Sequence, residues 1–254
     1  MKKYLKSLIG GYRQMKLQQL YSHVRKAVDD YRLIDAGDKI AVGISGGKDS
    51  LTLLYALSGL RRFYPEPFEL AAVTVDLGLE DTDFSAVAAL CDALEVPYYV
   101  VHTQIGQILF EERRESSPCS LCAKMRKGAL NEKAKEIGCN KIAYAHHMDD
   151  VIETALLSQL FEGRFYVFPP KTYFEDTALS VIRPMIYVTE VEVKGFRNKY
   201  GLPVVKNPCP VDGHTKRAYV KLLLRQINLE HPGVKTRLFH AVCTGNIEGW
   251  IPGA

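Results

Sequence analysis

The chain has 254 residues, of which 47% are hydrophobic and 24% are charged, and its formal net charge is +4. This length allows one substantial core with a small appendage, and no apolar run approaches a membrane span. The N-terminus lacks the apolar segment of a signal peptide, so we expect a cytoplasmic protein without a membrane partner. The six cysteines do not suggest a secreted disulfide scaffold in a chain this long; paired cysteines in a reducing compartment are more often metal ligands or redox groups.

The first predicted element is an amphipathic helix at about residues 14–33. Its apolar positions are Leu17, Leu20, Tyr21, Val24 and Val28. Lys16, Arg25 and Lys26 lie among them, either on a solvated face or on an arm that faces RNA. We assign residues 1–35 to an N-terminal helical arm.

Residues 36–212 alternate between strand and helix patterns. Strands are expected at 39–44, 68–75, 97–101, 141–145 and 202–205, and helices at about 49–60, 84–94, 120–137, 149–161 and 189–200. This alternation predicts an α/β domain with a doubly wound, mostly parallel sheet and helices on both faces. Asp81, Thr82 or Asp83 would cap the second helix, and Gly138 would end the third. The segment 164–184 breaks the alternation and is expected to be irregular or a small hairpin.

A glycine-rich stretch, Ser45-Gly46-Gly47-Lys48-Asp49-Ser50, lies between the first strand and the first helix of this domain. Two glycines let the backbone approach a phosphate, and the helix start supplies unpaired N–H donors. A Walker-type loop is excluded, because Val42 stands where a glycine is needed and Asp49 follows the lysine. The stretch therefore predicts a phosphate-binding loop of another type than the Walker loop. The alternative is a plain strand-to-helix turn that binds no phosphate.

Polar residues follow the other strands at the same edge of the predicted sheet. Asp76 follows the second strand, Cys119 and Cys122 follow the third, His146 to Asp150 follow the fourth, and Cys209 follows the last. Ligands of open α/β sheets bind at the carboxyl ends of the strands, so these residues predict one composite site.

The pattern of cysteines does not decide which metal or redox group they form. Cys119-x-x-Cys122 needs further ligands, and Cys209 is the cysteine placed at the correct edge, whereas Cys91 lies on a predicted core face. Three thiolates suit a 4Fe–4S cluster with one open iron. Zinc completed by a histidine and a catalytic dithiol are the alternatives.

Two carboxylates, Asp149 and Asp150, begin the helix that follows the fourth strand. One of them is expected to hold Mg²⁺ or to act on the substrate, and Asp150 is the better candidate. Simple N-capping by Asp149 is the alternative.

The tail, about residues 214–242, is predicted to be helical, and we assign 213–254 to a C-terminal helical extension. Arg217, Lys221 and Arg225 follow each other at a spacing of four, opposite an apolar face. This basic stripe either binds an RNA backbone or is an ordinary solvated face.

Together these motifs resemble the tRNA 2-thiocytidine synthetases, which are PP-loop ATP pyrophosphatases. The matching segments are Ile34 to Lys39, Ser45 to Ser50, Cys119 to Cys122 with Arg126 and Lys127, Ala143 to Thr154, Pro169-Pro170-Lys171 and Ile182-Arg183-Pro184. The chain departs from that pattern after Cys209, where family members often carry a second cysteine, and in Met185 to Glu190. The sister 2-thiouridine enzymes usually have added zinc-binding cysteine pairs, which this chain lacks, and usually Asn in place of His147.

The resemblance implies an ATP-dependent tRNA sulfurtransferase that adenylates the C2 oxygen of a cytidine and replaces it with sulfur. Ser45, Gly46, Gly47, Lys48, Asp49, Ser50, Asp76 and His146 would bind ATP, with Mg²⁺ near Asp49, and Arg126, Asp49 and Asp150 would be catalytic. Cys119, Cys122 and Cys209 would hold a 4Fe–4S cluster whose open iron binds sulfide. Expected partners are tRNA, ATP and a sulfur donor, either a cysteine desulfurase or free sulfide, and a homodimer is possible. The alternatives are a tRNA 2-thiouridine synthetase, a non-thiolating adenylating enzyme and an iron–sulfur RNA-binding sensor.

Overall fold

A six-stranded sheet in the order β3-β2-β1-β4-β6-β5 lies at the centre of the computed structural model, which describes residues 15–79, 82–112, 118–205, 209 and 215–253. The strands are β1 Lys39–Gly43, β2 Glu69–Asp76, β3 Tyr98–His102, β4 Lys141–Ala143, β5 Lys171–Phe174 and β6 Leu179–Ile182. Every neighbouring pair is parallel except β5 and β6, which form an antiparallel hairpin. The predicted mostly parallel sheet is confirmed.

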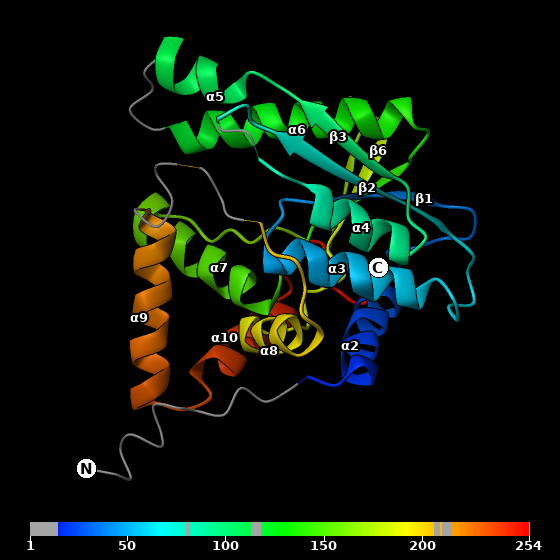
Figure 1. Ribbon diagram of the computed structural model, residues 1–254. Helices are drawn as coiled ribbons and strands as arrows, with labels where there is room; N and C mark the ends of the chain where they lie inside the picture. Colours follow the sequence, from blue (N-terminus) through cyan, green and yellow to red (C-terminus); the bar gives the residue numbers. More distant parts are fainter. Residues whose placement is uncertain (1–14, 80–81, 113–117, 206–208, 210–214, 254) are drawn as a thin grey trace, which may run out of the picture.

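Helices cover both faces of this sheet (Figure 1). Side chains alternate along β1, so that Ile40 and Val42 face one core and Ala41 faces the other. On the Ala41 side α6, Pro118–Glu136, packs Leu130 and Ala134 against the sheet. The Ile40 side is covered by α2 Leu17–Asp30, α3 Lys48–Leu60, α4 Ser85–Ala93, α7 Met148–Glu162 and α8 Glu190–Tyr200. The doubly wound arrangement is therefore confirmed.

Two helices form the C-terminal part, α9 Lys216–Glu230 and α10 Val234–Thr244. The expected helical tail is confirmed, with a break at Gly233, whose φ of +86° suits glycine. Both helices pack against α7, and Val220 of α9 is buried in the same core as α2 and α3. The predicted domain boundaries at residues 35 and 212 stay predictions, and Met1 to Gln14 of the arm lie outside the described residues. Within the described residues, no helix is long and apolar enough to cross a membrane.

The connections carry one correction. The predicted strand at 202–205 is wrong, because these residues form no strand and Val204 donates its N–H to the carbonyl of Leu202 at 2.9 Å, which turns the chain locally. Pro203 lacks an N–H for a ladder, and the β5–β6 hairpin already occupies this end of the sheet. Val205 instead donates its N–H to the carbonyl of Gly46 at 3.0 Å, which brings the segment to the glycine-rich turn. After β3, a short α5, Ile105–Gln107, and a π-helical turn η1, Ile108–Glu112, precede α6.

The predicted helix boundaries hold closely in two places. Gly138 lies beyond the end of α6 with a φ of +77°, as expected for a residue that terminates a helix. For α4 the N-cap residue is Phe84, which was not among the three candidates, but Asp83 next to it accepts the N–H of Ser85 at 2.8 Å; Asp81 lies outside the described residues.

Candidate functional site

The glycine-rich turn between β1 and α3 is held by its own two serines. Ser45 donates its N–H to Ser50 Oγ at 3.2 Å, and Ser50 Oγ donates to the carbonyl of Gly47 at 3.0 Å. Gly46 has a φ of +76°, and a Cβ at this position would lie 3.0 Å from Cβ of Val205. Gly47 caps α3 without a side-chain acceptor, so the first N–H groups of the helix stay available for an anion.

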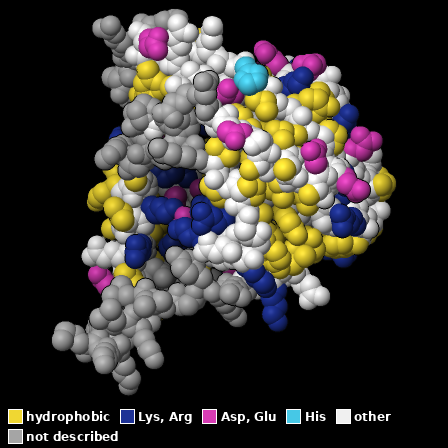
Figure 2. Space-filling view, viewed as in Figure 1, with side chains coloured by type: hydrophobic (Ala, Val, Ile, Leu, Met, Phe, Trp, Pro, Cys, Tyr) yellow, Lys and Arg dark blue, Asp and Glu magenta, His cyan; other side chains and the backbone are white. Residues whose placement is uncertain are grey.

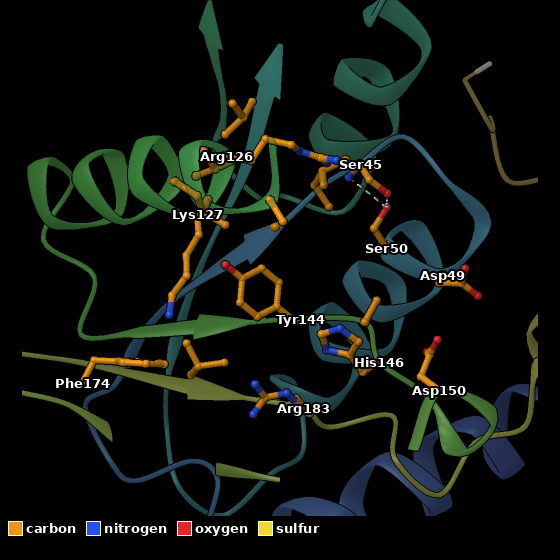
Figure 3. Close-up of a pocket in the computed structure, with 18 residues that line it drawn as sticks. Ser45, Asp49, Ser50, Arg126, Lys127, Tyr144, His146, Asp150, Phe174 and Arg183 are labelled. Carbon is orange, nitrogen blue, oxygen red and sulfur yellow. Dashed lines mark hydrogen bonds between the residues drawn. The ribbon is translucent and has the colours of Figure 1, made fainter. Parts of the chain in front are cut away.

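A cavity of about 540 Å³ opens beside this turn, between α6 and the carboxyl ends of β1, β4 and β6 (Figure 3). The predicted site residues that line it are Ser45, Asp49, Ser50, Arg126, His146 and Asp150. Its volume falls in the range of small-molecule sites. We call it the main cavity. The structure thus brings the glycine-rich turn together with the polar residues that follow β4, as the common-edge argument predicted, and adds Arg126 from α6.

Asp150 lies at the mouth of the main cavity and also caps α7. It accepts the N–H of His147 at 2.9 Å, while its own N–H donates to Nδ1 of His147 at 3.3 Å. Arg217 of α9 lies 3.5 Å from its carboxylate. The alternative role of Asp149, simple N-capping, is wrong, since the N-cap residue is His147, whose extended backbone lets its ring accept from the helix start.

Asp149 points away from the main cavity and joins three elements. Its carboxylate accepts the N–H of Glu190 and the ammonium of Lys235, both at 2.7 Å. Burial by itself would raise the pKa of Asp149, but these two donors lower it below its usual value. Asp149 therefore anchors α8 and α10 to α7.

Glu190 forms ion pairs with lysines from three helices. Its carboxylate lies 2.6 Å from Lys221 Nζ, 3.0 Å from Lys194 Nζ and 3.6 Å from Lys48 Nζ. Burial opposes ionisation, yet the bonds from Lys221 and Lys194 lower the pKa of Glu190 to about 2. Lys48 also lies 2.8 Å from Asp49, so the lysine predicted to hold phosphate contacts two carboxylates in this structure.

Asp76, at the end of β2, lines a second cavity of about 190 Å³ on the other side of the turn. Its carboxylate accepts the N–H of Gly78 at 3.1 Å and lies 3.0 Å from Nδ1 of His102. Ser45, Gly47, Thr74 and Phe84 line the same space. We call it the Asp76 cavity. It continues the predicted nucleotide site along the strand edge.

The three predicted cluster ligands line a third cavity of about 170 Å³, the cysteine cavity. Cys119 and Cys122 lie on the first turns of α6, and Cys209 joins them from the segment before α9. Burial raises the pKa of the Cys122 thiol, which Arg126 partly offsets. The described residues contain no group of three or more His, Cys, Asp or Glu that could hold a single metal ion. Thiolates around a cluster lie further apart than the ligands of one ion, and apart from Arg126 the other residues that line this cavity are apolar or glycine.

Arg126 lines all three cavities. It lies one turn beyond Cys122 on α6 and reaches toward Ser45 (Figure 3). Its guanidinium forms no ion pair with any described carboxylate. A cation at the junction of three cavities is placed to contact ligands in each of them.

The inner part of the main cavity contains residues that the sequence did not identify as site residues. Tyr144, Lys127, Phe174 and Arg183 line it together with His146. Burial, and then the charge of Arg183, lower the pKa of His146 to about 4, and burial lowers the pKa of Arg183 to about 10. The available signal was Ile182-Arg183-Pro184, but it follows β6, which the sequence analysis did not separate from an irregular segment.

The basic stripe of α9 is divided in the structure. Arg217 and Lys221 turn toward carboxylates, with Arg217 3.7 Å from Glu153 and Lys221 bound to Glu190. Arg225 is exposed and forms no ion pair with a described residue. Lys and Arg side chains gather in a hollow between the part that carries α7 and α9 and the part that carries α3 and α4 (Figure 2). RNA binding by the stripe stays a prediction.

Comparison with known proteins places these observations in context. A family profile described as a PP-loop domain matches residues 13–227. A tRNA-cytidine(32) 2-sulfurtransferase from Geobacter sulfurreducens is 39% identical over 92% of this chain and 91% of its own length. The enzyme of the same name from Pelobacter propionicus is 41% identical over 91% of this chain and 87% of its own length.

Among solved structures, the U34-tRNA thiolase NcsA from Methanococcus maripaludis, determined with its [4Fe-4S] cluster, superposes with a TM-score of 0.72. The match covers 89% of this chain and 76% of the thiolase, at 26% sequence identity. The similarity therefore extends through the sheet and the helices that surround the three cavities.

Proposed function

The chain belongs to the PP-loop family and, within it, to the tRNA-cytidine(32) 2-sulfurtransferases, and we propose on this basis that it replaces the C2 oxygen of a tRNA cytidine with sulfur in an ATP-dependent reaction. The observation that carries the proposal is the meeting of three cavities at Arg126. ATP, a sulfur source and a nucleotide must meet at one point in such a reaction, and separate cavities that share one cation supply that arrangement.

The first step forms a bond between the cytidine O2 and the α-phosphorus of ATP. The bond from that phosphorus to the bridging oxygen breaks, and pyrophosphate leaves with the electron pair. The N–H groups at the start of α3, Ser45 and Ser50 hold the phosphates, and Asp49 lies where Mg²⁺ would offset their charge. Asp76 and the cavity around it receive the adenosine.

In the second step, sulfur bonds to C2 and AMP leaves with the former O2. Arg126 stabilises the negative charge that develops on the departing AMP. Asp150 lies at the cavity mouth and acts as the proton acceptor or as a Mg²⁺ ligand. Its bond to the His147 N–H holds the carboxylate in place. His146, predicted to bind ATP, contributes to the same cavity.

Cys119, Cys122 and Cys209 would hold a 4Fe–4S cluster. The fit rests on three thiol side chains around one mostly apolar cavity next to Arg126. When bound, a cluster with three thiolate ligands supplies an iron with an open position for the sulfur that is transferred. The [4Fe-4S] cluster of the similar thiolase supports this assignment.

The partners proposed with this function are tRNA, ATP and a sulfur donor, and a cytoplasmic location follows from where these substrates are found. A homodimer is part of the proposal. Residues 1–35 and 213–254 are proposed to act as helical extensions that hold tRNA, with Arg217, Lys221 and Arg225 near its backbone.

A second candidate is thiolation of a tRNA uridine, because a solved structure with a similar fold, at a TM-score of 0.72, is a U34-tRNA thiolase. The higher identity to the cytidine enzymes favours cytidine. Nucleoside mass spectrometry of total tRNA from a strain that lacks this protein, beside its parent, tests the choice. Selective loss of 2-thiocytidine supports the proposal, loss of 2-thiouridine transfers it to uridine, and unchanged thiolated nucleosides overturn it.

A further inference from the structure

Arg183 is a buried cation without a carboxylate partner. Its side chain follows β6, is only 9% exposed, and donates from Nη1 to the carbonyl of Pro169 at 2.6 Å and to Thr172 Oγ1 at 3.2 Å. Its guanidinium lies 5.0 Å from the ring centroid of Phe168. Among the described residues, Nε has no hydrogen-bond partner and no acidic group pairs with the side chain. Burying such a group costs free energy unless a ligand completes its bonds.

A second unpartnered polar atom lies in the same cavity. His146 Nδ1 is buried and has no hydrogen-bond partner among the described residues. The His146 ring packs on Phe168 with 4.7 Å between centroids, and lies 5.9 Å from the ring of Tyr144. Tyr144, His146 and Arg183 lie around one space in the main cavity (Figure 3), and we call them the Arg183 subsite.

We propose that the Arg183 subsite binds the target cytosine, with the Nε–Nη2 edge of Arg183 donating to the O2 and N3 atoms of the base. This inference rests on the proposed function and names the residue that recognises its substrate. Nη1 is already occupied by Pro169 and Thr172, and Nε is buried without a partner among the described residues, so the Nε–Nη2 edge is the part of the guanidinium left to bond a ligand. That edge carries two parallel N–H donors, which match two adjacent acceptors.

A base fits this subsite better than a phosphate. The walls include the rings of Tyr144, His146 and Phe174, and aromatic rings are the surfaces on which unstacked bases are held. The uncharged ring of His146 suits the exocyclic amine of cytosine rather than an anion, so this inference places His146, predicted from the sequence to bind ATP, on the base instead. Phosphates have their own donors at the start of α3, on the opposite side of the cavity mouth.

The arrangement also distinguishes the two pyrimidines. Cytosine presents two adjacent acceptors, O2 and the N3 lone pair, to the two donors of Arg183. Uracil carries a hydrogen on N3, which would face an N–H of the guanidinium. A site whose polar groups are left unpaired by the wrong ligand rejects it strongly. Arg183 is therefore a specificity-determining residue for cytidine.

The test measures thiolation of tRNA transcripts that carry cytidine, 3-deazacytidine or uridine at position 32. 3-Deazacytidine replaces N3 by C–H and removes one acceptor. The wild-type protein should prefer cytidine over 3-deazacytidine by roughly 10- to 100-fold in kcat/KM, the usual range for a bidentate contact. In Arg183→Lys, the cytidine over 3-deazacytidine ratio should fall to within about threefold of the ratio of the two nucleosides' intrinsic reactivities in a chemical reference reaction. Lysine offers a point charge and not two parallel N–H donors.

Arg61→Lys is the matched control. Arg61 also donates to two backbone carbonyls, those of Leu94 and Glu95, but it lies outside the three cavities. This variant should keep the wild-type preference. An unchanged preference in Arg183→Lys overturns the inference, as does a selective loss of pyrophosphate or ATP binding in that variant, which would assign Arg183 to phosphate.

Two further measurements separate the possible failures. If the wild-type protein thiolates no cytidine transcript, the proposed function fails and the inference with it. If it thiolates cytidine but binds cytidine and 3-deazacytidine transcripts equally well without ATP, only the inference fails. The binding measurement involves no chemistry and no variant, so it decides the question even where Arg183→Lys does not fold.

Discussion

The two sides of the candidate site differ in whether their charged side chains have partners of opposite charge. On the side of α7 to α10, every acidic residue named here has a basic partner: Asp149 with Lys235, Asp150 with Arg217, Glu190 with Lys221. On the side of α6 and β6, three cations, Arg126, Lys127 and Arg183, line the main cavity without a carboxylate partner among the described residues.

This contrast distinguishes charged residues that hold helices together from charged residues that are available to bind a ligand. Ion pairs between buried groups of different helices fix how those helices sit, and removing one partner leaves an uncompensated charge. Unpaired cations that a cavity partly desolvates instead make the fold less stable until an anion or an acceptor arrives. We therefore expect substitutions on the paired side to change stability, with Asp150, which also has a proposed catalytic role, as the exception, and those on the unpaired side to change activity.

The largest effect is expected beside the unpaired side, in the cysteine cavity. Cys209→Ser should abolish sulfur transfer because serine is a poor ligand for iron, while tRNA-dependent release of pyrophosphate continues. Iron content and thiolated nucleosides are measured in anaerobically prepared protein. Cys243→Ser, in α10, is the control and should keep both. Full thiolation by Cys209→Ser would remove the cluster from the mechanism.

Arg126→Gln should lower the thiolation rate by about 10²- to 10³-fold, the usual effect of removing one electrostatic stabiliser of a transition state. Its free energy of unfolding should stay unchanged or rise slightly, because no ion pair is lost. Single-turnover assays and urea unfolding measure the two quantities. Arg164→Gln, which loses an exposed pair with Glu162 and a cation–π contact with the Tyr166 ring, should change neither. A destabilised Arg126→Gln protein with normal activity would reverse the contrast.

Glu190→Gln tests the paired side and should lower the free energy of unfolding at pH 7 by about 1–3 kcal/mol. The pKa of Glu190 falls from 4.5 to about 2 on folding, so its contribution is complete well above pH 4.5. The difference from wild type should shrink as the pH falls toward 2.

Urea unfolding between pH 3 and pH 7 measures this difference. Glu136→Gln is the control, since Glu136 pairs with Lys133 on the surface and should contribute less than about 1 kcal/mol. A pH-independent difference in Glu190→Gln would mean that packing, not charge, accounts for its effect.

The smallest effect is expected for Arg225→Ala, at the exposed end of the basic stripe. Loss of one phosphate contact should weaken tRNA binding a few-fold and reduce the slope of log K against log salt by roughly 1. Lys133→Ala on α6 is the comparison. Equal slopes for Arg225→Ala and wild type would leave Arg225 on a solvated face.

Where prediction failed, a single cause recurs. The small hairpin, one of the two expectations for 164–184, is confirmed as β5–β6, whereas the strand expected at 202–205 is wrong. Both segments contain β-prone residues. Which one pairs beside β4 depends on contacts between residues far apart in the chain. The β5–β6 hairpin occupies that position, because β6 pairs with β4. Arg183, which follows β6, therefore lines the main cavity.

The alternation of strands and helices and the position of the glycine-rich turn could be predicted from the residues alone. The sequence also placed Asp76, the cysteines and His146 at one edge. These follow from local periodicity and from a general rule for parallel sheets. Only the tertiary structure decided which charges are paired. Ion pairs such as Asp149 with Lys235 join residues 86 positions apart, and no local pattern specifies such a contact. Glu190 and Arg183 are both buried, but their partners differ. Lysines stabilise the charge of Glu190, whereas Arg183 Nε has no hydrogen-bond partner among the described residues.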